Sequence, residues 1–131
     1  MKKRLIPCIF LKEGLIVRSE DFQTHQIIGN AVSQVRRFSD WAVDEIVYID
    51  ISKNQIYDNR RDDHMVKTAS NKFDLLEEIS KNIFVPFAFG GGVRTISDME
   101  NILQRGADKV VLNTVLHNDK ELLKKAVNIF G

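Results

Sequence analysis

The sequence is poor in several features that would each point to a particular class of protein. It has one cysteine among 131 residues, which excludes a disulfide framework and a cysteine-based zinc site. No apolar run reaches the roughly 18 residues that a membrane-spanning helix needs. Its 19 basic and 18 acidic residues almost cancel, so the positive surplus that nucleic-acid binding requires is missing. We therefore expect a soluble, cytoplasmic protein without a nucleic-acid or membrane partner.

Proline and glycine are also scarce, with 2 and 7 residues, and 44% of the chain is hydrophobic. This composition is typical of one ordinary globular unit and excludes a disordered tail. We treat residues 1–131 as a single domain. Cys8 lies inside an apolar run, so we expect it in the core rather than as a nucleophile.

Short apolar runs alternate with helical patterns along the chain. Runs that are apolar on both faces predict buried strands of a mostly parallel sheet, and they cover residues 5–11, 45–51, 84–89 and 109–112. Amphipathic patterns predict helices over residues 30–42, 71–83, 96–105 and 119–130. Asn30 is a candidate N-cap, and Thr95 with Asp98 forms a candidate capping box. The order βα, repeated four times, predicts an α/β fold.

Four βα units make half of a (β/α)₈ TIM barrel, which needs eight strands and about 250 residues. We expect such a half-barrel to be incomplete, and to pair with a second half-barrel or self-associate. A small, open, doubly wound sheet is the alternative, because about 130 residues suffice for it. Residues 14–29 and 52–70 fit neither a helix nor a strand, so we expect long loops after the first two strands.

A faint internal repeat joins the two halves of the chain. Residues 42–47 and 106–111 both place a small residue, an aspartate, a charged residue and two apolar residues ahead of or within a predicted strand. The repeat suggests duplication of quarter-barrel pieces.

Polar and glycine residues follow the predicted strands, where a βα protein builds its active face. The triplet at residues 90–92 is either a plain tight turn or a place where the backbone approaches a phosphate. Asn113 and Thr114 end the next strand in the equivalent place, which favours a phosphate site. Asp50 ends the second predicted strand. Its carboxylate is either a general acid or base at the active face or a buried group that anchors the following loop.

Charged residues stand at the opposite ends of these strands. Arg4, Glu45 and Lys109 each begin a predicted strand, so in a barrel they converge on the bottom rim. There they form either a ring of alternating charge with a function or a stabilising salt-bridge cluster. The three histidines lie in predicted loops without the spacing of metal ligands.

Four blocks of the sequence resemble the cyclase subunit of imidazole glycerol phosphate synthase. They are RLIPCIFLKEG at 4–14, DEIVYIDI at 44–51, VPFAFGGGVR at 85–94 and GADKVVLNT at 106–114. The resemblance covers nearly the whole chain and the N-terminal half of that family's barrel. It implies a glutaminase partner, whose ammonia crosses the barrel and reacts with a phosphoribulosyl aminoimidazole carboxamide nucleotide to give imidazole glycerol phosphate. It implies no metal and no organic cofactor.

The resemblance also assigns roles by position. The phosphate grip would comprise Gly91, Gly92, Asn113 and Thr114. The charged gate at the ammonia entrance would comprise Arg4, Glu45 and Lys109. Asp108 matches a position near the glutaminase interface, and Asp50 matches an acidic active-site position.

One departure affects the chemistry most. Phe10 stands where the family has the aspartate that serves as catalytic acid and base, and a phenylalanine cannot transfer protons. Cyclase turnover should therefore be impaired, with Asp50 as a tentative substitute. The sequence keeps the residues of the charged gate but lacks the catalytic aspartate. This combination also resembles a divergent branch of the family that is found with surface-polysaccharide genes, whose members are thought to pass ammonia to a sugar amidotransferase.

Overall fold

The computed structural model describes residues 2–53, 57 and 69–131 as an α/β structure. The strands in this part of the chain are β1 (Cys8–Lys12), β2 (Leu15–Glu20), β3 (Thr24–Asn30), β4 (Ile46–Asp50), β5 (Phe87–Gly90) and β6 (Lys109–Val111). The helices are α1 (Ala31–Asp40), α2 (Lys72–Asn82), α3 (Ile96–Gln104), α4 (Thr114–Asn118) and α5 (Lys120–Phe130). The four predicted strands and four predicted helices are all present, and α4 is an additional short helix.

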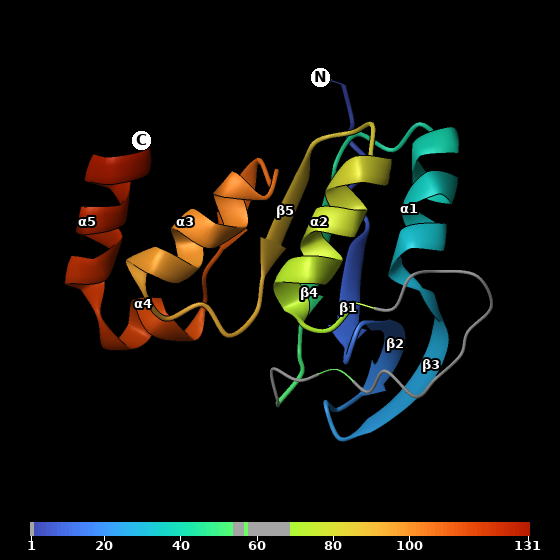
Figure 1. Ribbon diagram of the computed structural model, residues 1–131, viewed down its shortest axis with the longest axis horizontal. Coiled ribbons are helices and arrows are strands. Elements are labelled where there is room, and N and C mark those ends of the chain that lie inside the picture. The colour runs from blue at the N-terminus through green and yellow to red at the C-terminus, as the bar shows by residue number, and fades with distance from the viewer. Residues whose placement is uncertain (1, 54–56, 58–68) are drawn as a thin grey trace.

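The six strands form one sheet in the order β3-β2-β1-β4-β5-β6. Strands β1, β4, β5 and β6 are parallel to one another and follow one another in chain order. The helices α1, α2, α3 and α5 cross the molecule in the same order (Figure 1). A doubly wound sheet reverses its strand order at one point. The parallel strands of this sheet run in chain order without such a reversal, and β2 and β3 only extend the edge at β1 as an antiparallel hairpin, so the arrangement is that of half a barrel.

The helices cover one face of the sheet and leave the other open. Leu11, Tyr48 and Phe89 have no exposed surface, and they join residues from α1, α2, α3 and α5 in a single hydrophobic core. Side chains alternate along a strand, so Phe10 and Ile49 lie on the opposite face, which we call the inner face. Both are only partly buried. The inner face is thus the interior wall of the barrel.

Cys8 is also on the inner face, and the expectation that it is a core residue is wrong. The residue is exposed, whereas its neighbour Ile9 is 6% exposed and belongs to the core. A continuous apolar run does not tell which residues face the helices, because the alternation that would show it is absent from the sequence.

The expectation of a long loop over residues 14–29 is likewise wrong. These residues form the antiparallel hairpin of β2 and β3, and β2 pairs with the last residues of β1 through Phe10 and Val17. At the hairpin tip both Asp21 and Phe22 have positive φ, at 50° and 54°. A two-residue turn of this kind normally carries Asn or Gly, so its sequence gave no turn signal.

Local sequence signals set the helix starts as predicted. The Asn30 side chain accepts hydrogen bonds from the amides of Val32 and Ser33 at the start of α1. Thr95 and Asp98 form the predicted capping box of α3. Most of the segment 52–70, which includes His64, lies outside the described residues. In the part of the chain that is described, no helix is long and apolar enough to span a membrane.

The internal repeat has a structural counterpart. Ala42 and Gly106 both have positive φ, at 54° and 101°. Two residues later, the Asp44 carboxylate accepts a hydrogen bond from the Leu5 amide at 2.7 Å. The Asp108 carboxylate does the same with the Phe87 amide at 2.8 Å. In each repeat an aspartate therefore holds the backbone at the start of the neighbouring strand (Phe87 of β5) or just before it (Leu5, ahead of β1).

Candidate functional site

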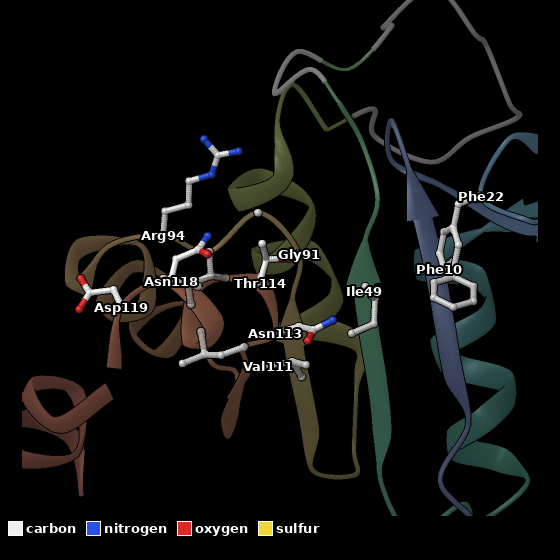
Figure 2. Close-up of a pocket in the computed structure, with 14 residues that line it drawn as sticks. Phe10, Phe22, Ile49, Gly91, Arg94, Val111, Asn113, Thr114, Asn118 and Asp119 are labelled. Carbon is white, nitrogen blue, oxygen red and sulfur yellow. The ribbon is translucent and has the colours of Figure 1, made fainter. Parts of the chain in front are cut away.

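The carboxyl ends of the parallel strands surround a cavity of about 920 Å³. Its wall on the inner face includes Phe10, Ile49 and Val111. The strand register places these residues in one row, because Phe10 pairs with Ile49, Ile49 with Gly90, and Gly90 with Val111. The row gives the cavity an apolar side, and Figure 2 shows Phe10, Ile49 and Val111 around it.

All four residues predicted to grip a phosphate line this cavity. They are Gly91, Gly92, Asn113 and Thr114. The Asn113 side chain makes no capping hydrogen bond to α4, so its amide is available to a ligand. Arg94 also lines the cavity, and its exposed side chain extends away from the strands in Figure 2. The structure thus brings the predicted group together, while its binding of phosphate stays a prediction.

Gly91 is required by its surroundings. Its φ is +103°, and a Cβ there would lie 2.0 Å from the carbonyl oxygen of Asp50. Gly92 also has positive φ, at +62°, but a Cβ there would meet nothing within 4 Å. Glycine is therefore needed at position 91 because of both the close packing against Asp50 and the positive φ, and at position 92 because of the positive φ alone.

Replacing Gly91 by alanine should destabilise the protein by about 2–5 kcal/mol, because left-handed strain adds to overpacking against β4. The Gly92→Ala variant should lose only about 1–2 kcal/mol, since its methyl group points into open space. Urea unfolding of the two variants measures the difference. Equal losses would contradict the close approach at Gly91.

Asp50 lies in a different environment from Phe10. It is 8% exposed, and its carboxylate accepts hydrogen bonds from the Ser52 amide at 2.9 Å and from the Tyr57 hydroxyl at 2.8 Å. It lines a second cavity of about 340 Å³ and not the larger one. These contacts are those of a loop anchor, and a catalytic role for Asp50 stays a prediction.

Two buried tyrosines differ in their hydroxyl partners. Burial raises the pKa of the Tyr57 hydroxyl, as do the charge and hydrogen bond of Asp50, so it stays protonated and donates. Burial also raises the pKa of Tyr48, whose hydroxyl has no hydrogen-bond partner among the described residues. The first hydroxyl therefore stabilises a carboxylate, whereas the second is an unsatisfied buried group.

We expect Tyr57→Phe to cost about 1–3 kcal/mol, because the buried Asp50 carboxylate loses a donor. The matched variant Tyr48→Phe should be neutral or slightly stabilising, because it removes a buried hydroxyl that makes no hydrogen bond to any residue the structure describes. Thermal and urea unfolding of both variants test this. A larger loss for Tyr48→Phe than for Tyr57→Phe would show that the two hydroxyls have been assigned the wrong way round.

Phe10 is held by a second aromatic ring. Its centroid lies 5.5 Å from that of Phe22 in an edge-on arrangement, and both residues line the larger cavity. Phe22 stands at the hairpin tip, 63% exposed and with positive φ. Sequence reasoning placed no role on Phe22, because nothing in its neighbourhood indicated that residues 14–29 fold back over the inner face.

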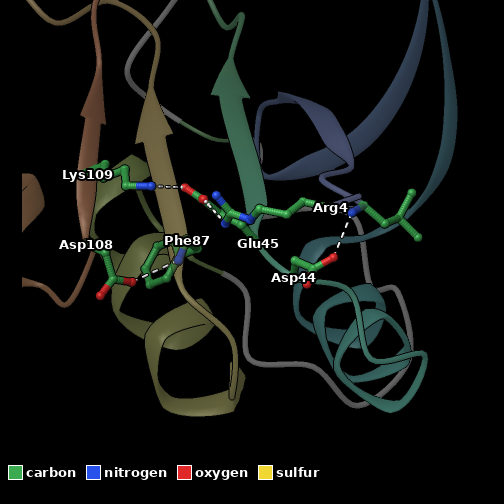
Figure 3. A network of polar contacts seen from close by, with 7 residues as sticks. Arg4, Asp44, Glu45, Phe87, Asp108 and Lys109 are labelled. Atoms are coloured by element: carbon green, nitrogen blue, oxygen red, sulfur yellow. Dashed lines mark hydrogen bonds and ion pairs between the residues drawn. The ribbon is translucent and has the colours of Figure 1, made fainter. Parts of the chain in front are cut away.

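At the opposite edge of the sheet, one carboxylate joins two cations. Glu45 accepts from the Arg4 guanidinium at 2.7 Å and from the Lys109 ammonium at 2.7 Å. The Glu45 side chain is 6% exposed, whereas those of Arg4 and Lys109 are more than half exposed. Figure 3 shows this triad, with Asp44 and Asp108 on either side. The predicted charged rim therefore forms, with Glu45 at its centre.

The described residues contain no group of three or more histidine, cysteine, aspartate or glutamate side chains arranged to hold a metal ion. The fold and its two edges define half of a (β/α)₈ barrel, with polar groups at the carboxyl edge and a charged cluster at the amino edge. Residues 4–131 match the family described as histidine biosynthesis protein, and the chain belongs to that family.

The chain is similar to named members of the imidazole glycerol phosphate synthase group. Subunit HisF of that enzyme from Natranaerobius thermophilus is 30% identical over 131 residues, which are all of this chain and 48% of the relative. Two proteins provisionally named subunit hisF2 are also similar. The one from Vibrio vulnificus is 37% identical with 44% of it covered, and the one from Campylobacter jejuni is 33% identical with 48% covered. The chain spans about half the length of these curated relatives.

Proposed function

We propose that the chain is part of a cyclase-type subunit of an imidazole glycerol phosphate synthase-like glutamine amidotransferase complex. It would act in the cytoplasm, taking ammonia from a glutaminase and forming imidazole glycerol phosphate from the phosphoribulosyl aminoimidazole carboxamide nucleotide. The observation that carries this proposal is the Arg4–Glu45–Lys109 triad at the amino edge, directly below the inner face. We expect no metal or organic cofactor.

The inner face above the triad suits a neutral molecule. The row next to the triad comprises Cys8, Val47 and Ala88 and ends at Lys109, and the next row begins with Phe10. An apolar wall disfavours ammonium because a buried, unpaired charge is costly. Ammonia itself carries no charge. The triad would exclude water and ions at the entrance while the wall conducts ammonia towards the larger cavity.

The amino edge also carries large apolar side chains that the chain itself leaves uncovered. Leu5 precedes β1, Trp41 follows α1 and Phe84 precedes β5, and they are 64%, 68% and 87% exposed. Aromatic residues on an exposed surface are typical anchors of protein interfaces. We propose that this surface, together with Asp108, receives the glutaminase.

Chemistry at the carboxyl edge should be impaired. Phe10 has no group that transfers a proton, and Asp50, the tentative substitute, is engaged with Ser52 and Tyr57. A single acid or base is typically worth 10²–10⁴-fold in rate. The phosphate grip around Gly91, Gly92, Asn113 and Thr114 would still bind the phosphorylated substrate.

The contact between Phe10 and Phe22 favours a second function. It fills the place of a catalytic acid with a packed aromatic pair, which a working cyclase would not need. Under this alternative the protein is a non-cyclase subunit that conducts ammonia to a sugar amidotransferase in surface-polysaccharide synthesis. The gate and the glutaminase surface are common to both functions.

Ammonia-dependent cyclisation of the nucleotide, by protein made from the complete gene, tests the proposal. We expect weak but measurable turnover. Robust turnover would mean that another group replaces the lost aspartate. No turnover, in a folded protein that still activates a glutaminase, would favour the ammonia conduit.

A further inference from the structure

The smaller cavity of about 340 Å³ lies next to the glycine turn that follows β5. It shares Gly91, Gly92 and Arg94 with the larger cavity, but its other walls come from the end of β4 and the starts of α2 and α3. Those walls comprise Asp50, Ser52, Lys53, Lys72, Thr95 and Asp98. The proposed function names Asp50, Gly91 and Gly92 of this lining but gives the cavity itself no role.

Lys72 is the unusual member of this lining. It is the first residue of α2 and only 5% exposed. Among the residues that the structure describes, its ammonium has no hydrogen bond or ion pair, and its contact is with the face of the Phe73 ring, 5.2 Å from the centroid. Burying an ammonium without a paired anion is costly. The cavity beside it is where an anion can supply that partner.

The two carboxylates of the lining already have donors. Asp50 accepts from Ser52 and Tyr57, and Asp98 accepts from the amides of Arg94 and Thr95 at 3.0 and 2.9 Å. Burial acts to raise the pKa of Asp98, but these donors and the nearby charge of Lys72 lower it below its ordinary value. The positive charge of Lys72 therefore acts on Asp98 in the lining of the cavity. Because the two carboxylates already have other donors, they offset that charge only in part.

Further positive charge lies close by. Arg94 is exposed and lines both cavities, and Lys53 lines this one. Lysine binds phosphate as a compact point charge, and arginine binds it through its planar fork. We propose that the smaller cavity is a second anion subsite, in which Lys72 binds a phosphate group of a small molecule. It borders Gly91 and Gly92 of the proposed grip but does not include Asn113 and Thr114.

Inorganic phosphate is the probe, and the protein made from the complete gene is the sample. An Asn113→Asp variant disables the proposed grip by placing a negative charge there. Calorimetric titration of this variant should retain one phosphate site, and the further change Lys72→Met should weaken that site at least about tenfold. The matched control Lys81→Met alters an exposed lysine of α2 that pairs with Glu77 and Glu78, and should leave binding unchanged.

Thermal unfolding gives an independent readout. Without phosphate, Lys72→Met should raise Tm, because it removes a buried charge that has no paired anion in the described part of the chain. Phosphate should raise the Tm of the Asn113→Asp variant and not that of the double variant. A lower Tm for Lys72→Met together with unchanged phosphate affinity would overturn the proposal and make Lys72 a structural residue.

A measurement on the Asn113→Asp variant does not depend on whether the lysine variant folds. In NMR spectra of this variant, the resonance of the Lys72 side-chain amine should shift as phosphate is added, whereas that of Lys81 should not. An unmoved Lys72 resonance would overturn the subsite. If the unaltered protein binds no more phosphate than the Asn113→Asp variant while the Lys72 shift is intact, the phosphate grip of the proposed function is refuted and this subsite still stands.

Discussion

Replacing Phe10 by aspartate should raise ammonia-dependent cyclisation by roughly 10²–10⁴-fold over the unaltered protein. The row that contains Phe10 also holds Ile49 and Val111 on the wall of the larger cavity. An introduced carboxyl would stand beside these apolar side chains, which raise a carboxyl pKa towards the range of a general acid. The new carboxyl would face the larger cavity, which the residues of the proposed phosphate grip also line.

The Phe10→Asn variant is the matched control, because asparagine has the same size as aspartate but transfers no proton. Both variants lose the contact with Phe22, so a rate gain confined to Phe10→Asp belongs to acid–base chemistry. Equal rates for the two variants would contradict a disarmed cyclase site and favour the ammonia conduit.

Replacing Glu45 by glutamine should destabilise the protein by about 1–3 kcal/mol. The change leaves Arg4 and Lys109 side by side without the carboxylate that joins them, and their exposure keeps the loss below that of a fully buried pair. Urea unfolding at neutral pH measures it. The control Glu121→Gln alters an exposed pair with Lys124 and should change stability by less than about 0.5 kcal/mol.

The contribution of Glu45 should also depend on pH. Its hydrogen bonds with Lys109 and Arg4 hold its pKa below the ordinary value of 4.5, although burial opposes this. Because the folded pKa is the lower one, the stabilisation is fully present above about pH 4.5 and disappears as the pH falls through the folded value. The difference between the unaltered protein and Glu45→Gln should therefore shrink in acid. A difference that grows in acid would contradict the pairing.

Much of the fold follows from local sequence patterns. The parallel strands are continuous apolar runs, and the helix starts carry side chains such as Asn30 and Thr95 that cap the backbone. The rim was also predictable, because Arg4, Glu45 and Lys109 each stand before or at the start of a strand. Parallel strands in chain order bring such positions to one edge.

The remaining features depend on contacts between distant segments. The hairpin of β2 and β3 was missed because Asp21 and Phe22 adopt a turn that normally carries glycine or asparagine. Lys72 was missed because burial of a lysine at a helix start has no local signature. The environment of Asp50 was left open, since only the placement of Tyr57 shows that its carboxylate anchors a loop.

Stimulation of a glutaminase subunit of the imidazole glycerol phosphate synthase type is the most direct test of the central claim, that the amino edge receives ammonia. We predict that protein from the complete gene raises glutaminase turnover, and that Trp41→Asp and Phe84→Asp abolish the effect. The control Ile28→Asp changes an exposed apolar residue on β3, next to the start of α1, and should preserve it. Glutaminase turnover that is the same with and without the folded protein would contradict the claim.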